Sequence, residues 1–469
     1  MTYAFSFDSK FCSGCKACQA ACKDKNSLPA GVLWRRVYEI TGGSWQKVGE
    51  AWTNSVFAYN FSISCNHCAY PKCAGVCPTD AYILREDGIV YLDTTKCAGC
   101  GYCSWACPYG APQYNPDAGY MTKCDFCVDQ LELGLPPICV TACPMRVLNH
   151  GELDSCKGIP MWDVSSAVHP FPMPEFSHTQ PHLAIQPHPA MSRLEEKMVA
   201  NLEEIEPRKH SVWDDIPLMI FTLLGQLAVG GYWVMYWIFP PLWAPVSSDA
   251  TVLRLLPILF IGTSLGIGML ASFAHLGTKK NAWRMLAHQK KSWLSREILF
   301  ALLFGFGWLY TTFEIISLHR MTPEAAGVTT SLGLGLVYSM AQVYRLATIP
   351  RWNTWKTNAG FLTSTFLLGL SVMLLILIFE SGIAGIHIPD IQWKLLYGIM
   401  LVLLFTQLAL VQGKYSNTSK LRVELIWAGV ISVVGGIVQS SSMAWLGILT
   451  FLIVILEEGL GRWLFYQSR

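Results

Sequence analysis

Sixteen of the 17 cysteines in this 469-residue chain fall into four groups of four. Two groups share the spacing C-x2-C-x2-C-x3-C, and the other two have a wider second gap. In chain order, the groups are Cys12, Cys15, Cys18 and Cys22; Cys65, Cys68, Cys73 and Cys77; Cys97, Cys100, Cys103 and Cys107; and Cys124, Cys127, Cys139 and Cys143. A proline follows every group except the first, which Lys23 follows.

This spacing is typical of ferredoxins that bind two clusters. Three cysteines on a tight loop can reach three irons of one cubane. We expect the fourth to start a helix that points away, so that it binds the neighbouring cluster. At four ligands per cubane, the sixteen cysteines predict four [4Fe–4S] clusters. Cys156 is left over and is expected to be a free structural thiol.

Zinc and disulfides are the alternatives for so many cysteines. Zinc sites use paired C-x2-C knuckles and have no need of a repeated x3-C-P ending. The N-terminal sequence has no basic region followed by an apolar one and no twin-arginine pair, so no export signal is predicted. The thiols are therefore expected to stay reduced. Export in complex with a signal-bearing partner is the exception left open.

Composition separates two parts of the chain. Hydrophobic residues make up 52% and charged residues 14%, which favours a membrane protein, and a net charge of +2 gives no indication of nucleic-acid binding. We predict an α+β ferredoxin-like four-cluster domain (1–156) fused to an all-α eight-helix transmembrane bundle (214–469). Between them, 157–213 reads as a Pro- and His-rich linker with a short amphipathic helix. Its histidines are expected to be linker rather than metal ligands: His169, His178, His182 and His188.

Eight apolar stretches are long enough to cross a bilayer. They lie near 216–239, 252–276, 294–318, 324–346, 359–380, 391–412, 421–439 and 443–466. Buried helices of a soluble domain are disfavoured by stretches this long and this numerous. Charged residues within them include Glu314, Glu457, Glu458 and Arg462. Glu314 could relay protons, but it is expected to be solvated near a helix end. Glu458 and Arg462, four residues apart on one helix, are expected to form a structural pair.

Basic residues predict the orientation in the membrane. The loops after the second, fourth and sixth stretches are basic, whereas those after the first, fifth and seventh are neutral or acidic. The basic residues are Lys279, Lys280, Arg284, Lys290 and Lys291; Arg351 and Lys356; and Lys414, Lys420 and Arg422. By the positive-inside rule these loops, both termini and the cysteine domain lie on the cytoplasmic side of the inner membrane.

The membrane part offers few redox ligands. Its histidines, His275, His288, His319 and His387, all lie at helix ends or in loops, so a haem b pair is not expected. A quinone needs only an apolar slot with a residue that hydrogen-bonds its oxygen and takes its proton. His275 ends the second stretch and Glu297 opens the third, and both are candidates. The alternative is that they stabilise the ends of their helices.

Four segments around the cysteines resemble the iron–sulfur subunit of anaerobic dimethyl sulfoxide reductase and related molybdopterin-oxidoreductase subunits. They are CSGCKACQAAC, CNHCAYPKCAGVCP, CAGCGYCSWACPYGAP and KCDFC…CVTACP. Three later segments resemble the membrane anchor of the same family: AHLGTKKNAWRMLAHQKKSWLSREIL, VYRLATIPRWNTWKT and EEGLGRWLFY. The chain therefore resembles a fusion of two subunits that are usually separate.

The resemblance implies how the clusters share ligands. Each would take three cysteines from one group and one from another, and the last would lie nearest the membrane. The implied sets are Cys12, Cys15 and Cys18 with Cys143; Cys124, Cys127 and Cys139 with Cys22; Cys65, Cys68 and Cys73 with Cys107; and Cys97, Cys100 and Cys103 with Cys77. It also implies menaquinol binding by His275 and Glu297.

The function implied is electron transfer from menaquinol, through four clusters, to a separate molybdopterin catalytic subunit that reduces S- or N-oxides. Reverse flow from a sulfur-compound dehydrogenase into the quinone pool is the first alternative. A zinc-rich, non-redox domain tethered to a transporter is the second.

Overall fold

The computed structural model describes residues 2–153, 179–192, 199–200, 212–237, 248–318, 321–383, 390–411, 417–439 and 444–467. The chain divides into two compact units. The first comprises Met1–His210 with Gly277–Lys291, and the second comprises Ser211–Leu276 with Ser292–Arg469. We call them the cluster unit and the helical unit. Cys156, His169, His178, His319 and His387 lie outside the described residues.

Two three-stranded sheets form the frame of the cluster unit. The first has the order β10-β1-β11, with β1 (Tyr3–Asp8) antiparallel to β10 (Leu148–Glu152) and parallel to β11 (Leu183–Gln186). The second has the order β12-β2-β5 and contains β2 (Arg36–Gly42), β5 (Phe57–Ile63) and β12 (Val199–Ala200). Because apolar side chains of β1 and β5 face inward, they form one core with Phe126 and the cysteine loops.

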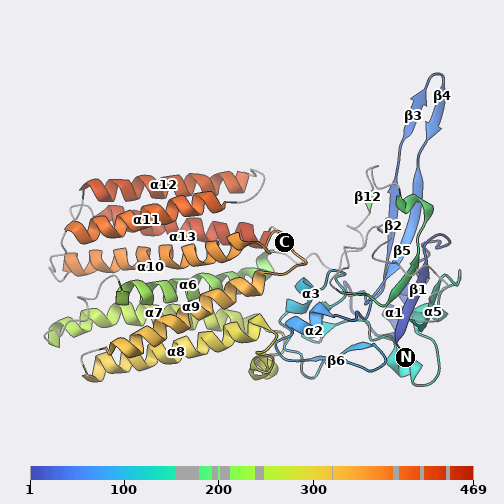
Figure 1. Cartoon of the computed structure of the whole chain (residues 1–469), viewed down its shortest axis with the longest axis horizontal. Coiled ribbons are helices and arrows are strands. Elements are labelled where there is room, and N and C mark those ends of the chain that lie inside the picture. Colours follow the sequence, from blue (N-terminus) through green and yellow to red (C-terminus); the bar gives the residue numbers. More distant parts are fainter. Residues whose placement is uncertain are drawn as a thin grey trace. The chain divides into compact units, whose positions relative to one another are not determined.

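Short hairpins and helices carry the cysteine loops. The hairpins are β3 (Trp45–Val48) with β4 (Ala51–Asn54), β6 (Tyr82–Leu84) with β7 (Val90–Leu92), and β8 (Gln113–Asn115) with β9 (Tyr120–Thr122). The helices are α1 (Ala17–Lys25), α2 (Lys72–Val76), α3 (Tyr102–Ala106), α4 (Val128–Leu131) and α5 (Ile138–Thr141). The β3–β4 hairpin extends away from the sheets (Figure 1).

Part of the expected linker is integral to the cluster unit. Residues 183–186 form a strand of the first sheet, and the 3-10 turn η2 (Pro189–Ser192) follows it. The ring of His188 stacks on Tyr59 at 5.3 Å. Val199–Ala200 pairs with β2 as a strand, where an amphipathic helix was expected. Pairing with β1 and β2 satisfies backbone N–H and C=O groups that a free linker would leave to water. Because β1 and β2 are far away in the sequence, the local pattern predicted a linker and a helix here instead of strands.

Eight long helices occur among the described residues of the helical unit, at the positions of the eight apolar stretches. They are α6 (Ile216–Trp237), α7 (Ser248–Ala274), α8 (Trp293–Leu318), α9 (Pro323–Tyr344), α10 (Trp355–Ile383), α11 (Asp390–Leu410), α12 (Asn417–Gln439) and α13 (Ala444–Gln467). Six of them, all but α9 and α13, are long and apolar enough to span a membrane. Eight crossings therefore stay a prediction.

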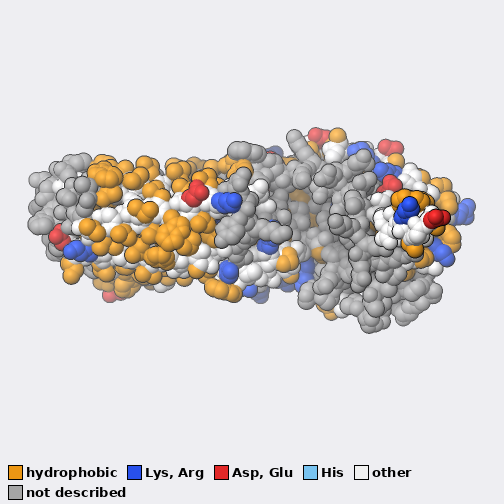
Figure 2. Space-filling view, turned by 90° about the horizontal axis from the view of Figure 1, so that it is seen from above, with side chains coloured by type: hydrophobic (Ala, Val, Ile, Leu, Met, Phe, Trp, Pro, Cys, Tyr) orange, Lys and Arg blue, Asp and Glu red, His pale blue; other side chains and the backbone are white. Residues whose placement is uncertain are grey.

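Apolar side chains point outward from this bundle. Leu270 is 69% exposed and Ile431 is 71% exposed, and hydrophobic side chains cover much of the helical surface seen in Figure 2. Water would disfavour such a surface, whereas lipid chains accept it. The helical unit is thus suited to a bilayer.

Glu314 is buried, which corrects the expectation that it is solvated. Its carboxylate accepts hydrogen bonds from the backbone N–H of Thr322 at 3.1 Å and from the Thr322 hydroxyl at 2.9 Å. Thr322 is the N-cap of α9. A carboxylate at a helix N-terminus satisfies donors that the helix leaves unpaired and interacts favourably with the helix dipole. The N-terminus of the next helix therefore holds Glu314 inside the bundle, a contact that the sequence pattern around Glu314 does not show.

Glu458 and Arg462 interact electrostatically within α13, as predicted. Each also bonds to a glutamine on another helix. Gln407 of α11 donates to Oε1 of Glu458 at 2.7 Å, and Arg462 donates to Oε1 of Gln226 on α6 at 2.6 Å. These contacts tie α6, α11 and α13 together inside the bundle, where an unpaired charge would be costly.

Candidate iron–sulfur sites and candidate quinol site

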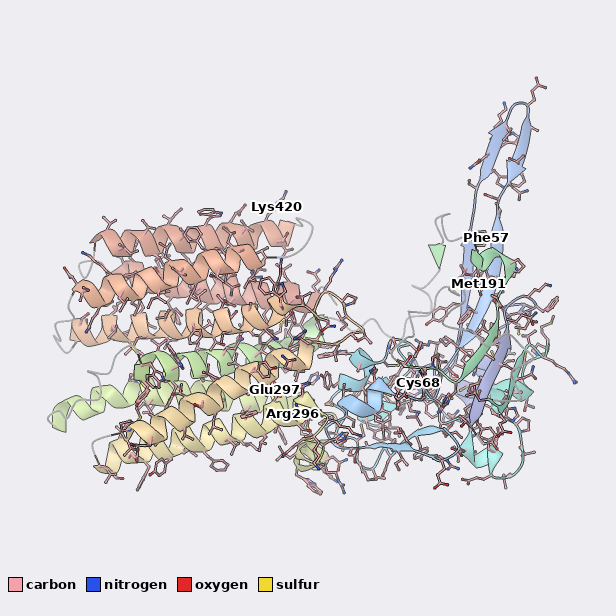
Figure 3. The ribbon with its side chains drawn as sticks, viewed as in Figure 1. Phe57, Cys68, Met191, Arg296, Glu297 and Lys420 are labelled. Carbon is pink, nitrogen blue, oxygen red and sulfur yellow. The ribbon has the colours of Figure 1, made fainter. Side chains whose placement is uncertain are left out.

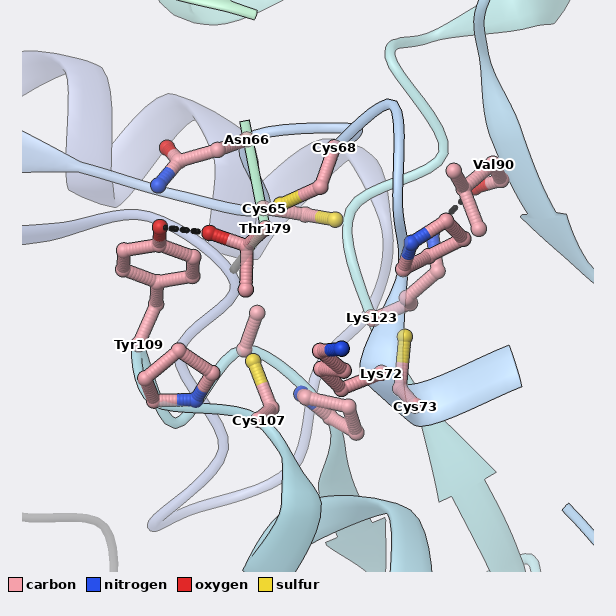
Figure 4. Close-up of a pocket in the computed structure, with 14 residues that line it drawn as sticks. Cys65, Asn66, Cys68, Lys72, Cys73, Val90, Cys107, Tyr109, Lys123 and Thr179 are labelled. Carbon is pink, nitrogen blue, oxygen red and sulfur yellow. Dashed lines mark hydrogen bonds between the residues drawn. The ribbon is translucent and has the colours of Figure 1, made fainter. Parts of the chain in front are cut away.

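Two pockets in the cluster unit are each lined by four cysteines. One is lined by Cys65, Cys68, Cys73 and Cys107 (Figure 4). The other is lined by Cys12, Cys15, Cys18 and Cys143. In both, three cysteines come from one sequence group and the fourth from another. The grouping matches the ligand sets that the family resemblance implies.

The remaining eight cysteines also lie near other motif cysteines. Cys22 lies within electrostatic range of Cys127 and Cys139, and Cys124 lies within range of Cys22 and Cys139. Cys77 lies within range of Cys97, Cys100 and Cys103. Cys124 also lies within range of Cys65, and Cys139 within range of Cys18, so proximity alone does not divide these eight between two sites. We group the sixteen cysteines as the family resemblance implies and name each quartet after the one cysteine that comes from another motif: the Cys143, Cys22, Cys107 and Cys77 quartets.

The position of the short helices corrects one expectation. In the second and third motifs the helix does not start at the fourth cysteine. Instead Cys73 lies in the first turn of α2 and Cys77 caps its C-terminus, while Cys103 and Cys107 have the same places in α3. At a rise of about 1.5 Å per residue, such a helix separates the third and fourth cysteines by about 6 Å. This separation lets them serve different quartets.

Glycine allows the cysteine loops to turn tightly. Gly99 has φ +70°, and a Cβ there would lie 2.4 Å from the carbonyl oxygen of Gly119. Its N–H points at the sulfur of Cys97, 3.4 Å away, and the N–H of Phe126 lies at the same distance from the sulfur of Cys124. Such N–H···S contacts are among the features that set cluster potentials.

Each quartet supplies four thiol groups, which is the ligand set of a [4Fe–4S] cluster. In a cubane each cysteine binds its own iron, so the four sulfurs stay apart. Burial raises the pKa of the Cys22 thiol to about 12 and that of Cys127 to about 11. Iron, which takes thiolates, must therefore displace protons at neutral pH.

Buried cations lie among the quartets, and the cysteine pattern did not point to them. Burial works to lower the pKa of Lys123, but negative charge on nearby groups, Cys65 and Cys73 first among them, outweighs it, and the net pKa is raised. Lys123 lines the Cys107 quartet pocket and donates to the carbonyl oxygens of Val90 and Cys124. The only sequence signal is that Lys123 precedes a motif cysteine.

Arg35 is a further buried cation. Its guanidinium donates to the hydroxyl of Ser64 at 2.8 Å and to that of Ser62 at 3.2 Å, and it lies over the ring of Phe5. Burial works against its charge, whereas nearby cysteines, Cys139 first among them, raise its pKa. Both cations offset negative charge that four thiolates would bring to each cluster.

The candidate quinol residues belong to the helical unit. His275 follows the last residue of α7, is half-buried, and its backbone N–H donates to the Ala271 carbonyl at 3.3 Å. Glu297 is the fifth residue of α8 and only 3% exposed; Figure 3 marks its place on that helix. Its carboxyl lies within electrostatic range of Tyr344 and Tyr466, whose hydroxyls bond to each other.

Two family models match the chain. Residues 56–153 match the 4Fe-4S dicluster domain, and residues 209–467 match the DMSO reductase anchor subunit (DmsC). The second match covers more than half of the chain. The chain belongs to the DMSO reductase anchor subunit family.

The N-terminal part of this DMSO reductase-family chain is similar to separate iron–sulfur proteins. It is 48% identical to the B subunit of anaerobic dimethyl sulfoxide reductase from Escherichia coli K12 over 185 residues, 39% of this chain and 88% of the relative. It is 40% identical to the thiosulfate reductase electron transfer subunit PhsB of Salmonella typhi over 154 residues, which cover 32% of this chain and 77% of the relative. It is 36% identical to the formate dehydrogenase iron-sulfur subunit of Wolinella succinogenes over 173 residues, which cover 32% of this chain and 82% of the relative.

The predicted fusion is confirmed by these matches: one polypeptide joins an iron–sulfur part and an anchor part of the DMSO reductase family. Binding of [4Fe–4S] clusters, electron transfer and attachment to a membrane through several helices follow from the same matches together with the six apolar helices.

Proposed function

We propose that the chain oxidises menaquinol in the membrane and passes the electrons through four [4Fe–4S] clusters to a separate molybdopterin subunit that reduces S- or N-oxides. The observation that carries this proposal is that cysteines of different motifs line one pocket: Cys107 with Cys65, Cys68 and Cys73, and Cys143 with Cys12, Cys15 and Cys18. When bound, each cluster accepts and releases one electron at a time. Shared ligands keep neighbouring clusters close, which suits a chain of single-electron steps.

His275 and Glu297 are the proposed proton acceptors for quinol. Oxidation of a quinol releases two electrons and two protons. The quinol site therefore needs basic groups that accept the protons while the electrons leave through the clusters. An imidazole takes one proton and a buried carboxylate takes the other, in the manner of general bases that touch the reacting hydroxyls. The burial of Glu297 in an apolar helix supports this role, since intramembrane carboxylates are costly unless functional or paired.

The terminal reaction is assigned to a partner. The Escherichia coli relative is by its name one subunit of a reductase that has others. The similarity of residues in the cluster unit to such subunits supports a catalytic subunit that docks on this unit. The candidate quinol site and the candidate clusters that would receive its electrons occur here in one polypeptide.

We place the cluster unit on the cytoplasmic side of the inner membrane. The basic segment Gly277–Lys291 belongs to the cluster unit, so this loop and the clusters share one side of the bilayer. By the positive-inside rule that side is the cytoplasm. Labelling of Lys280→Cys by an impermeant thiol reagent in intact cells and in inverted vesicles tests this, and labelling in intact cells would contradict it.

Reverse flow is the second candidate function. Similarity to the iron-sulfur subunit of a formate dehydrogenase favours it, because that module accompanies a donor-oxidising enzyme. Midpoint potentials that fall from the quinone side towards the partner side would decide for reverse flow. A zinc-rich domain on a transporter is not supported, since both family matches point to electron transfer.

The proposal is tested by separating quinol-linked from dye-linked turnover. In the complex with its catalytic partner, His275→Ala and Glu297→Gln should each lower menaquinol-dependent turnover by at least about 10-fold, a typical contribution of a positioned base being about 100-fold or more. Activity with a reduced viologen dye should stay as in the parent. Glu324→Gln, at an exposed position on α9, is the matched control. Unchanged quinol turnover in both variants would contradict the site.

A further inference from the structure

The segment Gly277–Lys291 connects two helices of the helical unit but belongs to the cluster unit. It contains the 3-10 helix η5 (Lys279–Leu286), in which Met285 is buried. In the sequence it lies within the anchor-like region, more than a hundred residues after the last motif cysteine. Its contacts therefore join two parts of the chain that are far apart in sequence.

Asn281 contacts the loop that carries the third cysteine motif. Its side-chain Nδ2 donates to the carbonyl oxygen of Thr95 at 2.8 Å and to that of Cys97 at 2.9 Å. One amide group thus holds two carbonyls at the entrance to this loop. A side-chain amide has two N–H donors, so both bonds can form at once.

His288 contacts the loop that carries the fourth cysteine of the second motif. Its ring Nδ1 lies 2.9 Å from the carbonyl oxygen of Cys77, and its backbone N–H donates to the carbonyl of Pro78 at 3.2 Å. A carbonyl oxygen only accepts, so Nδ1 carries the proton. The carboxylate of Asp80 lies 3.8 Å from the same nitrogen.

Glycine and threonine bring the segment against the cysteine loops. The backbone N–H of Thr278 donates to the carbonyl of Ala98, and its hydroxyl donates to that of Gly119 at 2.9 Å. A Cβ on Gly277 would lie 2.1 Å from the carbonyl oxygen of Gly119. Only glycine permits this close approach of backbone to backbone.

Cys77 and Cys97 belong to the same quartet, which comprises Cys77, Cys97, Cys100 and Cys103. Of the contacts described for the segment, those with motif cysteines all fall on this quartet. The two loops come from different motifs, and the segment bonds to both. Such outer contacts fix the orientation of metal ligands and tune the metal they hold.

We propose that Asn281 and His288 are positioning residues for the Cys77 quartet cluster, so that a segment of anchor sequence completes the site of one cluster out of four. This inference rests on the proposed function, since it assumes a cluster in that quartet. The side chains of Asn281 and His288 hold the two cysteine loops in place by donating hydrogen bonds to their backbone carbonyls, and these bonds offset the negative ends of the carbonyl dipoles. Loss of a donor should loosen this site alone, and a new negative charge beside it should make its reduction harder.

The test uses the full chain and a low-temperature EPR redox titration. Cys100→Ser first identifies the signal of the Cys77 quartet cluster. Asn281→Ala and His288→Ala should then shift or broaden that signal, or lower its occupancy, and leave the other signals as in the parent. Asn281→Asp, which keeps the shape but adds a carboxylate, should shift the midpoint potential of this cluster to more negative values.

Lys280→Ala is the matched control, because Lys280 is exposed in the same segment. It should leave every signal unchanged. The inference is overturned if all three variants at Asn281 and His288 show the parent spectrum and potentials, or if every cluster shifts alike. Absence of an EPR signal from the Cys77 quartet in the parent protein would instead overturn the four-cluster proposal, so the two failures are distinguishable.

Discussion

The ammonium group of Lys123 donates a hydrogen bond to the carbonyl oxygen of Cys124 at 2.9 Å while lying buried beside the Cys107 quartet. It therefore places a fixed positive charge between two cysteine motifs. A positive charge favours the more reduced, more negative state of a nearby cluster. We therefore expect Lys123 to raise the potential of a cluster bound in that quartet.

Replacing Lys123 by methionine should lower the midpoint potential of the Cys107 quartet cluster. The expected shift is on the order of 60 mV, the one-electron equivalent of about 1.4 kcal/mol. An EPR redox titration measures it. Lys47→Met, on the exposed strand β3, is the control and should change no potential. A shift to more positive potential would contradict the electrostatic role.

The shared quartets predict a specific pattern of cysteine variants. Cys107→Ser should alter the same cluster signal as Cys65→Ser, although 42 positions separate the two residues. Cys103→Ser, only four positions from Cys107, should alter a different signal. EPR spectra of the three variants and their iron content provide the measurement. If Cys103→Ser and Cys107→Ser affected one common cluster, the shared assignment would be wrong.

A buried ion pair should contribute to the stability of the helical unit. Nε of Arg422 on α12 donates to Oε1 of Glu457 on α13 at 2.8 Å, and Glu457 is 0% exposed. Arg422→Ala leaves this carboxylate without its cation and should destabilise the fold by roughly 3–5 kcal/mol. Thermal unfolding in detergent measures the loss. Lys420→Ala, exposed on the same helix, should have little effect (Figure 3).

Cluster retention should depend on pH. Burial raises the pKa of the free Cys100 thiol to about 12, and that of Cys107 to about 11. Without iron these groups are protonated at neutral pH, so iron competes with protons for them and its apparent affinity rises with pH. Iron retained against a chelator should therefore fall as the pH is lowered from about 9 to about 6. Retention that did not change with pH would contradict this.

The spacing of the cysteines predicted the iron–sulfur part well because each motif is local in sequence. Arg35, Asn281 and His288 could not be found that way, since they belong to other segments. Lys123 lies beside Cys124, but its burial near Cys65 and Cys73 depends on the fold. Local patterns also misplaced Glu314, whose partner Thr322 belongs to the next helix. The strand Leu183–Gln186 was missed because its partner β1 lies at the other end of the cluster unit sequence.

The most direct test is reduction of the purified, cluster-loaded protein by a menaquinol analogue. The protein should contain about sixteen iron atoms per polypeptide. The analogue should reduce clusters in the parent protein and fail to do so when His275 is replaced by alanine, while dithionite should reduce both proteins equally. Clusters that dithionite reduces but the analogue leaves oxidised in the parent would contradict the central claim.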